Sequence, residues 1–413
     1  MKYRHRVLGL LCLLSLITYL DRICISVAGP RMQQDLNIGP SEWGWVVGAF
    51  ALAYALFELP GGLWGDRAGA RVTLTRIVAW WSVFTALTGA ISNLGALLLV
   101  RFLFGAGEAG AYPIASASVS RWFPEAGRAQ AFGFIWMASQ MGGAIVPLLA
   151  VPIQMHFGWR VSFYFFGLVG ILWSLFWFFW YRDRPAEMRG ITSAELAEVE
   201  PPPLRDKSRT DWRGLLHCSN VWAIMGVGFC YVFVQYFFIA WLPTFLVRGR
   251  GFRETELYYT SAPFLLGALT NLLGGAIGDR AVSRFGLKWG RRAVGVAGLA
   301  VSAICLAAAA FVEGKAALLV LLALSYAGTT FQQPSAWAAC VDVGGPQSGA
   351  VSALMNTAAQ IGSLFLSISF GGFVARWRSY DLALAPLVVV LIAGAGLWLF
   401  VDAARPVNRL TSC

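Results

Sequence analysis

The stretch GGLWGDR (residues 61–67) recurs as GGAIGDR (residues 274–280), so one GGxxGDR pattern stands twice in the chain, 213 residues apart. A weaker pair, QMG (residues 140–142) and QIG (residues 360–362), is displaced by 220 residues, which fits if the loop over residues 281–292 is longer than its counterpart. A repeat of this length predicts two structurally equivalent halves that follow one another along the chain.

The composition is that of an integral membrane protein. The 413 residues are 58% hydrophobic and only 13% charged, with a mean hydropathy of +0.63, and a soluble core cannot cover so much apolar surface. Apolar runs near the roughly 20 residues that a spanning helix needs cover residues 7–29, 43–65, 72–92, 95–118, 130–155, 160–181, 221–247, 258–278, 292–312, 315–340, 347–371 and 383–402.

We therefore expect an all-α membrane protein with twelve transmembrane helices in two pseudo-symmetric six-helix bundles, residues 1–181 and 220–413. A hydrophilic stretch over residues 182–219 reads as a cytoplasmic linker, with a short helix around residues 193–200. The first apolar run follows a basic start, but its length, its internal charges and the lack of a cleavage site argue against a signal peptide.

The distribution of Lys and Arg predicts the orientation. With both termini in the cytoplasm, the inner loops and tails carry 22 of the 32 Lys and Arg residues and the outer loops carry 8. Basic inner loops facing anionic lipid explain the net charge of +11, so we expect no nucleic-acid partner. The arginine-rich composition favours a bacterial protein, and hence its inner membrane.

Few residues suggest catalysis or cofactor binding. The seven cysteines form no CxxC pair and most lie in apolar runs, so we expect buried thiols rather than disulfides or metal ligands. The three histidines form no cluster, and no GxxxxGK[ST] motif is present. We expect no metal, no cofactor and no catalytic residues.

Four charges lie inside apolar runs, namely Asp21 and Arg22 in the first run and Arg101 and Glu108 in the fourth. A charge at the centre of a membrane helix costs at least about 2.5 kcal/mol and usually has a functional role. Arg101 and Glu108 are seven residues apart, so they share one helix face, about 10 Å apart along the axis.

The chemistry of these four residues suggests binding of an anion coupled to proton movement. Arginine stays protonated, so Arg22 can hold a carboxylate at all times. Desolvation raises the pKa of a carboxyl group, and nearby arginines lower it. Either acid, Asp21 or Glu108, can therefore gain or lose a proton during a transport cycle. The alternative is a structural ion pair between Glu108 and Arg22, which we favour less because such pairs gain little over apolar packing.

Further polar side chains stand at similar depths and suggest recognition of hydroxyl groups, although each alone could be ordinary contact between helices. The candidates are Tyr19, Tyr54, Gln140, Gln235, Tyr236, Gln332, Gln333, Trp337, Asn356 and Gln360.

The two GGxxGDR loops suggest a cytoplasmic latch. Asp66 can pair with Arg71 and Arg128, and Arg67, Asp279 and Arg280 complete the set. The alternative is a tight turn whose arginines only fix topology. Glu58, close to the first loop, reads as a gating or snorkelling carboxylate rather than a coupling residue.

The first GGxxGDR loop and its echo resemble the signature loop of the major facilitator superfamily. YLDR (residues 19–22), RFLFGAGEAGAYP (residues 101–113), RWFP (residues 121–124) and YFFIAWLPT (residues 236–244) resemble its anion:cation symporter family, which takes up hexonates, hexuronates and related acids. The Gln332–Gln333 segment departs from the family pattern.

This resemblance implies roles for individual residues. The arginine at position 22 would bind the substrate carboxylate, Asp21 and Glu108 would carry protons, and Arg101 would tune Glu108. Substrate contacts would come from positions Tyr19, Tyr54, Gln140, Trp337 and Asn356.

We therefore expect a monomeric secondary transporter that imports an organic monocarboxylate, such as a hexonate or hexuronate, by proton symport through alternating access, with the small anion and the lipid bilayer as its partners. An organophosphate:phosphate antiporter would need a second arginine where the repeat puts Gln235. An organic-anion antiporter and a sodium-coupled symporter stay open, as does a transporter-like sensor, which would need an output domain. An enzyme lacks a nucleophile with its base.

Overall fold

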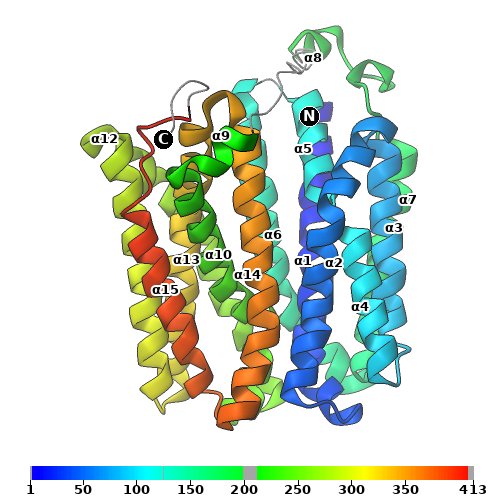
Figure 1. Ribbon diagram of the computed structural model, residues 1–413. Coiled ribbons are helices and arrows are strands. Elements are labelled where there is room, and N and C mark those ends of the chain that lie inside the picture. The colour runs from blue at the N-terminus through cyan, green and yellow to red at the C-terminus, as the bar shows by residue number, and fades with distance from the viewer. Residues whose placement is uncertain (1, 124, 199–211, 408–413) are drawn as a thin grey trace. The chain divides into compact units, whose positions relative to one another are not determined.

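The computed structural model describes residues 2–123, 125–198 and 212–407, without the side chains at positions 59, 61–68, 125–130 and 346. This described part of the chain is helical and contains no strand. It divides into two compact units, Met1–Ile38 with Ala49–Lys207, and Gly39–Gly48 with Ser208–Cys413 (Figure 1). The exact bounds of the expected bundles and linker stay a prediction.

The first unit is built around α1, which packs against α6 and α7, and around α3, which packs against α4, α5 and α7. Its elements are α1 (Tyr3–Asp35), most of α2 (Pro40–Ala68), α3 (Ala70–Thr88), α4 (Leu94–Glu108), α5 (Ala111–Trp122), α6 (Glu125–Phe157), α7 (Trp159–Trp180), the 3-10 turn η1 (Pro185–Glu187) and α8 (Ser193–Glu198).

In the second unit, α12 packs against α13 and α15, and α10 packs against α14 and α15. Its elements are α9 (Trp212–His217), α10 (Ser219–Ala240), α11 (Leu242–Thr244), the π-helical turn η2 (Phe245–Gly249), η3 (Glu254–Thr260), α12 (Ser261–Phe311), α13 (Lys315–Gly344), η4 (Gly345–Gln347), α14 (Ser348–Trp377), η5 (Leu382–Leu384) and α15 (Ala385–Trp398).

The twelve predicted apolar runs all lie in helices, with two differences in how they are divided. Residues 95–118 form two helices, α4 and α5, whereas residues 258–278 and 292–312 belong to one element, α12, bent at Gly286 with φ of 78°. Among the described residues, eight helices are long and apolar enough to cross a membrane, if α4 with α5 counts as one and α12 counts once. The remaining three runs lie in α2, α3 and α15, and α15 has only 14 residues.

The QMG and QIG repeats mark equivalent helix crossings in the two units. A Cβ atom on Gly142 of α6 would lie 2.5 Å from the carbonyl oxygen of Leu16 in α1. A Cβ atom on Gly362 of α14 would lie equally close to the carbonyl oxygen of Phe229 in α10. Glycine is therefore needed at both positions because backbone meets backbone.

The expected helix in the linker is confirmed as α8, and it holds the start of α1. The Glu195 carboxylate is buried and accepts a hydrogen bond of 2.9 Å from the backbone N–H of Arg4, an otherwise free donor in the first turn of α1. Lys2 and Arg4 both form ion pairs with Glu198. The hydrogen bond from Lys2, together with the charge of Arg4, holds the pKa of Glu198 below its ordinary value.

Replacing Gly142 by alanine should destabilise the first unit by about 1–3 kcal/mol, because the new methyl group forces α6 away from α1. Gly133→Ala is the matched control, since a Cβ atom on Gly133 of the same helix meets nothing within 4 Å. Thermal unfolding of the purified protein in detergent measures both. Equal unfolding temperatures for the two variants would contradict the close crossing.

Candidate functional site

The centre of the first unit holds an ion pair between α1 and α4. The Nε of Arg22 donates to Oε1 of Glu108, and the carboxylate is fully buried while the arginine side chain is 12% exposed. The ion pair between Glu108 and Arg22, the alternative that we favoured less from the sequence, is thus present. The pair fixes the register of α1 against α4.

Aromatic rings surround the Arg22 guanidinium. Its carbon atom lies 4.9 Å from the ring centre of Tyr54, 5.2 Å from that of Phe50 and 5.9 Å from that of Tyr19. Ring faces attract a cation without consuming its N–H donors. The buried Nη2 of Arg22 has no hydrogen-bond partner among the described residues, so the guanidinium keeps donor capacity for an anion.

Asp21 points to a different neighbour from Arg22 although the two are adjacent in sequence. Its side chain is 1% exposed, and its Oδ2 accepts a hydrogen bond of 3.0 Å from the indole N–H of Trp81 in α3. Successive helical residues point about 100° apart, so one faces α3 and the other faces α4. Asp21 still interacts electrostatically with Arg101 and Glu108.

Arg101 is also buried, 3% exposed, and its guanidinium lies over the rings of Phe104 at 4.6 Å and Phe50 at 5.2 Å. Gly105, one turn before Glu108, lets α4 approach α2, since a Cβ atom there would lie 2.5 Å from the carbonyl oxygen of Phe50.

All four predicted charges lie in one electrostatic network of the first unit, because Arg22 pairs with Glu108 and both Arg101 and Glu108 act on Asp21.

The helix that we expected over residues 95–118 is broken directly after Glu108. Ala109 is extended, with ψ of 134°, and Gly110 has φ of 91°, a left-handed conformation that favours glycine. Pro113, in the first turn of α5, lacks an N–H that a continuous helix would need. Glu108 therefore ends one helix, and Tyr112 lies in the first turn of the next.

A cluster of three hydroxyl groups next to the ion pair was missed by the sequence analysis. The Tyr112 hydroxyl lies 3.1 Å from Ser15 Oγ and 3.1 Å from Ser139 Oγ, and the Tyr112 ring stacks on Trp136 at 5.0 Å. Tyr112 interacts electrostatically with Arg22. The spacing of Ser15 and Arg22, seven residues on one face of α1, is the signal that could have revealed it.

The other predicted residues of the first unit lie near this network. Tyr19 faces Arg22 from the preceding turn of α1, and Tyr54 is 3% exposed on α2. Gln140 is 8% exposed on α6, next to Ser139. Glu58, one turn beyond Tyr54, is half-buried.

Most of the predicted residues in the second unit are partly accessible. Gln333 accepts a hydrogen bond of 3.2 Å from Asn271 of α12, a residue that the sequence analysis did not single out. The amide nitrogen of Gln235 is buried and has no partner among the described residues. Four further members belong to the same unit. They are buried Tyr236 on α10, half-buried Trp337 on α13, and half-buried Asn356 and Gln360 on α14.

Gln332 is an exception to the predicted set. Its side chain is fully buried, accepts a hydrogen bond of 3.2 Å from Trp398 of α15 and donates one to the carbonyl oxygen of Thr329. Its Cβ atom also packs against Gly298 of α12. Both polar groups are used within the unit, so Gln332 joins helices and is removed from the candidate site.

The predicted latch of the first unit is only partly described, because the side chains of Asp66, Arg67 and Arg128 lie outside the described residues. Arg71 donates from Nε to the carbonyl oxygen of Phe178, 2.7 Å away, and lies over the Phe178 ring. Its contact is thus with the end of α7.

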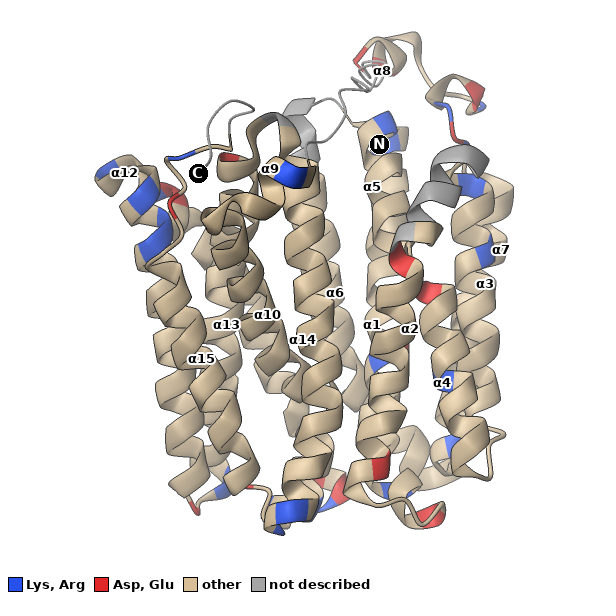
Figure 2. Cartoon of the chain, viewed as in Figure 1, with Lys and Arg blue, Asp and Glu red and all other residues tan. Residues whose placement is uncertain are grey.

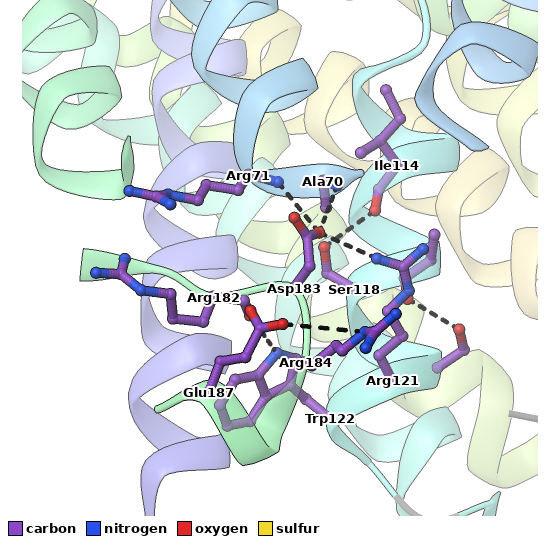
Figure 3. Close-up of polar contacts among 12 residues, drawn as sticks. Ala70, Arg71, Ile114, Ser118, Arg121, Trp122, Arg182, Asp183, Arg184 and Glu187 are labelled. Atoms are coloured by element: carbon purple, nitrogen blue, oxygen red, sulfur yellow. Dashed lines mark hydrogen bonds and ion pairs between the residues drawn. The ribbon is translucent and has the colours of Figure 1, made fainter. Parts of the chain in front are cut away.

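Asp183, which the sequence analysis did not single out, joins three helix ends (Figure 3). Its Oδ1 accepts hydrogen bonds from the backbone N–H groups of Ala70 at 2.6 Å and Arg71 at 3.3 Å, which begin α3, and pairs with Arg121 of α5 at 3.0 Å. Gly69 has φ of 81°, and a Cβ atom there would lie 2.7 Å from Asp183 Oδ2. Asp183 therefore supplies the cap that glycine cannot.

The second unit has comparable contacts at the bend of α12. Lys288 pairs with Asp402 at 2.9 Å, and Arg291 pairs with Asp342 at 3.1 Å and with exposed Asp279 at 3.7 Å. Arg280 is exposed. Charged residues gather at helix ends in both units, as Figure 2 shows.

The described residues contain no group of three or more His, Cys, Asp and Glu side chains that could hold a metal ion. Cys12, Cys24, Cys230, Cys305 and Cys340 are free thiols. Cys218 is disulfide-bonded, contrary to our expectation, and it lies at the N-cap of α10 rather than within an apolar helix.

Replacing Asp183 by alanine should destabilise the protein by about 1–2 kcal/mol, because α3 loses its cap and Arg121 its partner. Glu187→Ala is the control, since Glu187 pairs with Arg184 only at 3.9 Å and both side chains are more than half exposed. Thermal unfolding compares the variants. Loss of stability in the control but not in Asp183→Ala would refute this assignment.

The chain resembles transporters along nearly its whole length. The family model described as Major Facilitator Superfamily matches residues 11–365. A probable sulfoacetate transporter of Cupriavidus necator is 33% identical over 97% of this chain and 94% of its own. A hexuronate transporter of Bacillus subtilis is 31% identical over 86% of this chain and 85% of the transporter's own length. A D-galactonate transporter of Escherichia coli is 29% identical over 95% of this chain and 94% of the transporter's length.

A solved structure supports the fold. A bacterial homologue of the human lysosomal transporter Spinster, in an inward-facing and unoccupied conformation, has a TM-score of 0.80 to this chain, covering 97% of both chains at 20% identity. The family match and the transporter relatives agree with the repeated GGxxGDR loops and leave no ground for an enzyme. The chain belongs to the major facilitator superfamily.

Proposed function

We propose that this protein imports an organic monocarboxylate, a sugar acid such as a hexonate or a hexuronate, by proton symport through alternating access. The buried pair of Arg22 and Glu108 is the observation that carries the proposal. Relatives named for hexuronate and D-galactonate support the class of substrate. The proposal includes a monomer in a bacterial inner membrane with both termini in the cytoplasm.

Arg22 is the proposed anchor for the substrate carboxylate. Its charge is permanent, aromatic rings lie against its guanidinium, and Nη2 retains an unused N–H within the described part of the chain. A planar carboxylate matches the forked donors of arginine better than any neutral group does.

Glu108 is the proposed link between the anion and the proton. Its carboxylate and that of the substrate compete for one guanidinium, so protonation of Glu108 releases Arg22 to bind the substrate. The two binding events then favour one another, which is the thermodynamic requirement for symport. Asp21 is proposed as the second proton site and Arg101 as the cation that influences both acids.

Polar side chains of each unit are proposed to contact the substrate hydroxyl groups. In the first unit they are Tyr19, Tyr54 and Gln140, and in the second Gln235, Tyr236, Gln333, Trp337, Asn356 and Gln360. The cytoplasmic latch of Asp66, Arg67, Arg71, Arg128, Asp279 and Arg280 also stays a proposal, supported in the second unit by the pair of Asp279 with Arg291.

A carboxylate that carries a sulfonate is the second candidate substrate. The Cupriavidus necator relative, 33% identical, is named for sulfoacetate. A substrate with two acidic groups would need a second cation, and Arg101 is the other buried arginine of the first unit's network.

A ligand screen followed by transport assays tests the proposal. D-galactonate, D-glucuronate, sulfoacetate and inorganic phosphate are first compared by the rise in unfolding temperature that each produces. The acids that bind are then assayed for uptake into proteoliposomes under an imposed proton gradient, a sodium gradient or neither. Accumulation driven by sodium alone, or by exchange for phosphate alone, would replace proton symport with the corresponding mechanism.

Glu108→Gln should abolish proton-driven accumulation and retain exchange, because the glutamine leaves Arg22 available but takes up no proton. Arg22→Lys should weaken substrate binding at least about tenfold, because a point charge replaces a fork of donors. Uptake and counterflow of the acid found in the screen measure both, with Glu187→Gln as a control outside the site. If Glu108→Gln still concentrates substrate with normal pH dependence, the coupling assignment fails.

A further inference from the structure

Trp81 is a buried residue of α3 that contacts one of the proposed proton sites, Asp21. Its side chain is fully buried, and its indole N–H donates to Asp21 Oδ2 at 3.0 Å. The hydroxyl of Thr85, one turn further along α3, donates to the carbonyl oxygen of Trp81 and also faces the carboxyl group of Asp21. The carboxyl group of Asp21 is thus held against α3, whereas Arg22 faces Glu108 of α4.

The charged and titratable groups that face Asp21 come from two helices. Arg101 and Glu108 of α4 act on it electrostatically, and the thiol of Cys24 lies on its own helix. The Oδ1 atom is buried and has no hydrogen-bond partner among the described residues. The Trp81 indole is therefore a neutral donor that compensates a charge on this carboxyl group, and the hydroxyl of Thr85 acts in the same direction.

We propose that Trp81 is a positioning residue for Asp21, whose N–H group orients the carboxyl toward α3 and determines how readily it releases a proton during transport. The inference rests on the proposed proton symport. An N–H donor stabilises a carboxylate more than a carboxylic acid, because hydrogen bonds to ionised groups are about twice as strong. Removing the donor should make the proton harder to release.

A purely structural role for Trp81 is the competing explanation, since large buried aromatic residues stabilise cores by packing alone. Trp81→Phe keeps an aromatic ring in place and removes only the N–H group and part of the ring. Trp80→Phe is the matched control, because the neighbouring indole donates to a backbone carbonyl, that of Leu103, at 2.9 Å. Because Trp81 is fully buried and Trp80 is 45% exposed, a purely structural role predicts a loss of stability in Trp81→Phe without a change in the titration of Asp21.

The test uses the full-length protein in lipid and follows the infrared band of protonated carboxyl groups as the pH is changed, a readout that needs no substrate. The band that disappears in Asp21→Asn belongs to Asp21. In Trp81→Phe its midpoint should move to higher pH by about one unit, a tenfold change in proton affinity, and Trp80→Phe should leave it in place.

Transport by the same variants separates this inference from the proposed function. With D-galactonate, or the acid that the screen identifies, Trp81→Phe should shift the pH profile of proton-driven uptake upward and leave counterflow intact. An unmoved midpoint in Trp81→Phe, or an equal shift in Trp80→Phe, overturns the role of Trp81. A shifted midpoint without any proton-driven uptake in the wild type instead overturns proton symport and leaves the hydrogen bond's effect on Asp21 established.

Discussion

The ion pair between Arg22 and Glu108 constrains the whole first unit. Two charges withdrawn from water cost several kcal/mol each unless their geometry and their remaining hydrogen bonds compensate. The compensation here comes from several helices: α1 and α4 bring the charges together, and the rings of Phe50 and Tyr54 on α2 cover the guanidinium. Gly105 permits this cover by letting α2 and α4 meet at the backbone.

The same constraint separates the acids into different environments. Glu108 ends α4 beside the permanent charge of Arg22, whereas Asp21 faces α3 and its indole donor. Under the proposed proton symport, the two carboxyl groups would respond to different partners, Glu108 to the anion at Arg22 and Asp21 to the indole of Trp81. Asp21 and Glu108 remain coupled because each lies in the field of the other.

Features with local or periodic causes were predictable from the sequence, whereas long-range contacts were not. Apolar length identified the spans, and the GGxxGDR repeat identified the family. The break at Gly110 was missed because a run of glycine and alanine also fits a continuous helix. Trp81 lies 60 residues from Asp21, and Asp183 lies 112 residues from Arg71, so neither carries a local signal of its partner. Spacing alone likewise could not show that Gln332 faces α15.

The two glycine crossings separate what the halves of the chain share from what only one half has. Leu16 and Phe229 are 213 residues apart, as the GGxxGDR loops are, and Gly142 and Gly362 are 220 apart, so both partners of the contact occupy equivalent positions in the two halves. Arg22, at the same displacement, has Gln235 as its counterpart. The crossing is therefore a symmetric element of the scaffold, whereas the charge proposed to bind the anion belongs to one half only, so the repeat that shapes both units does not extend to the proposed binding chemistry.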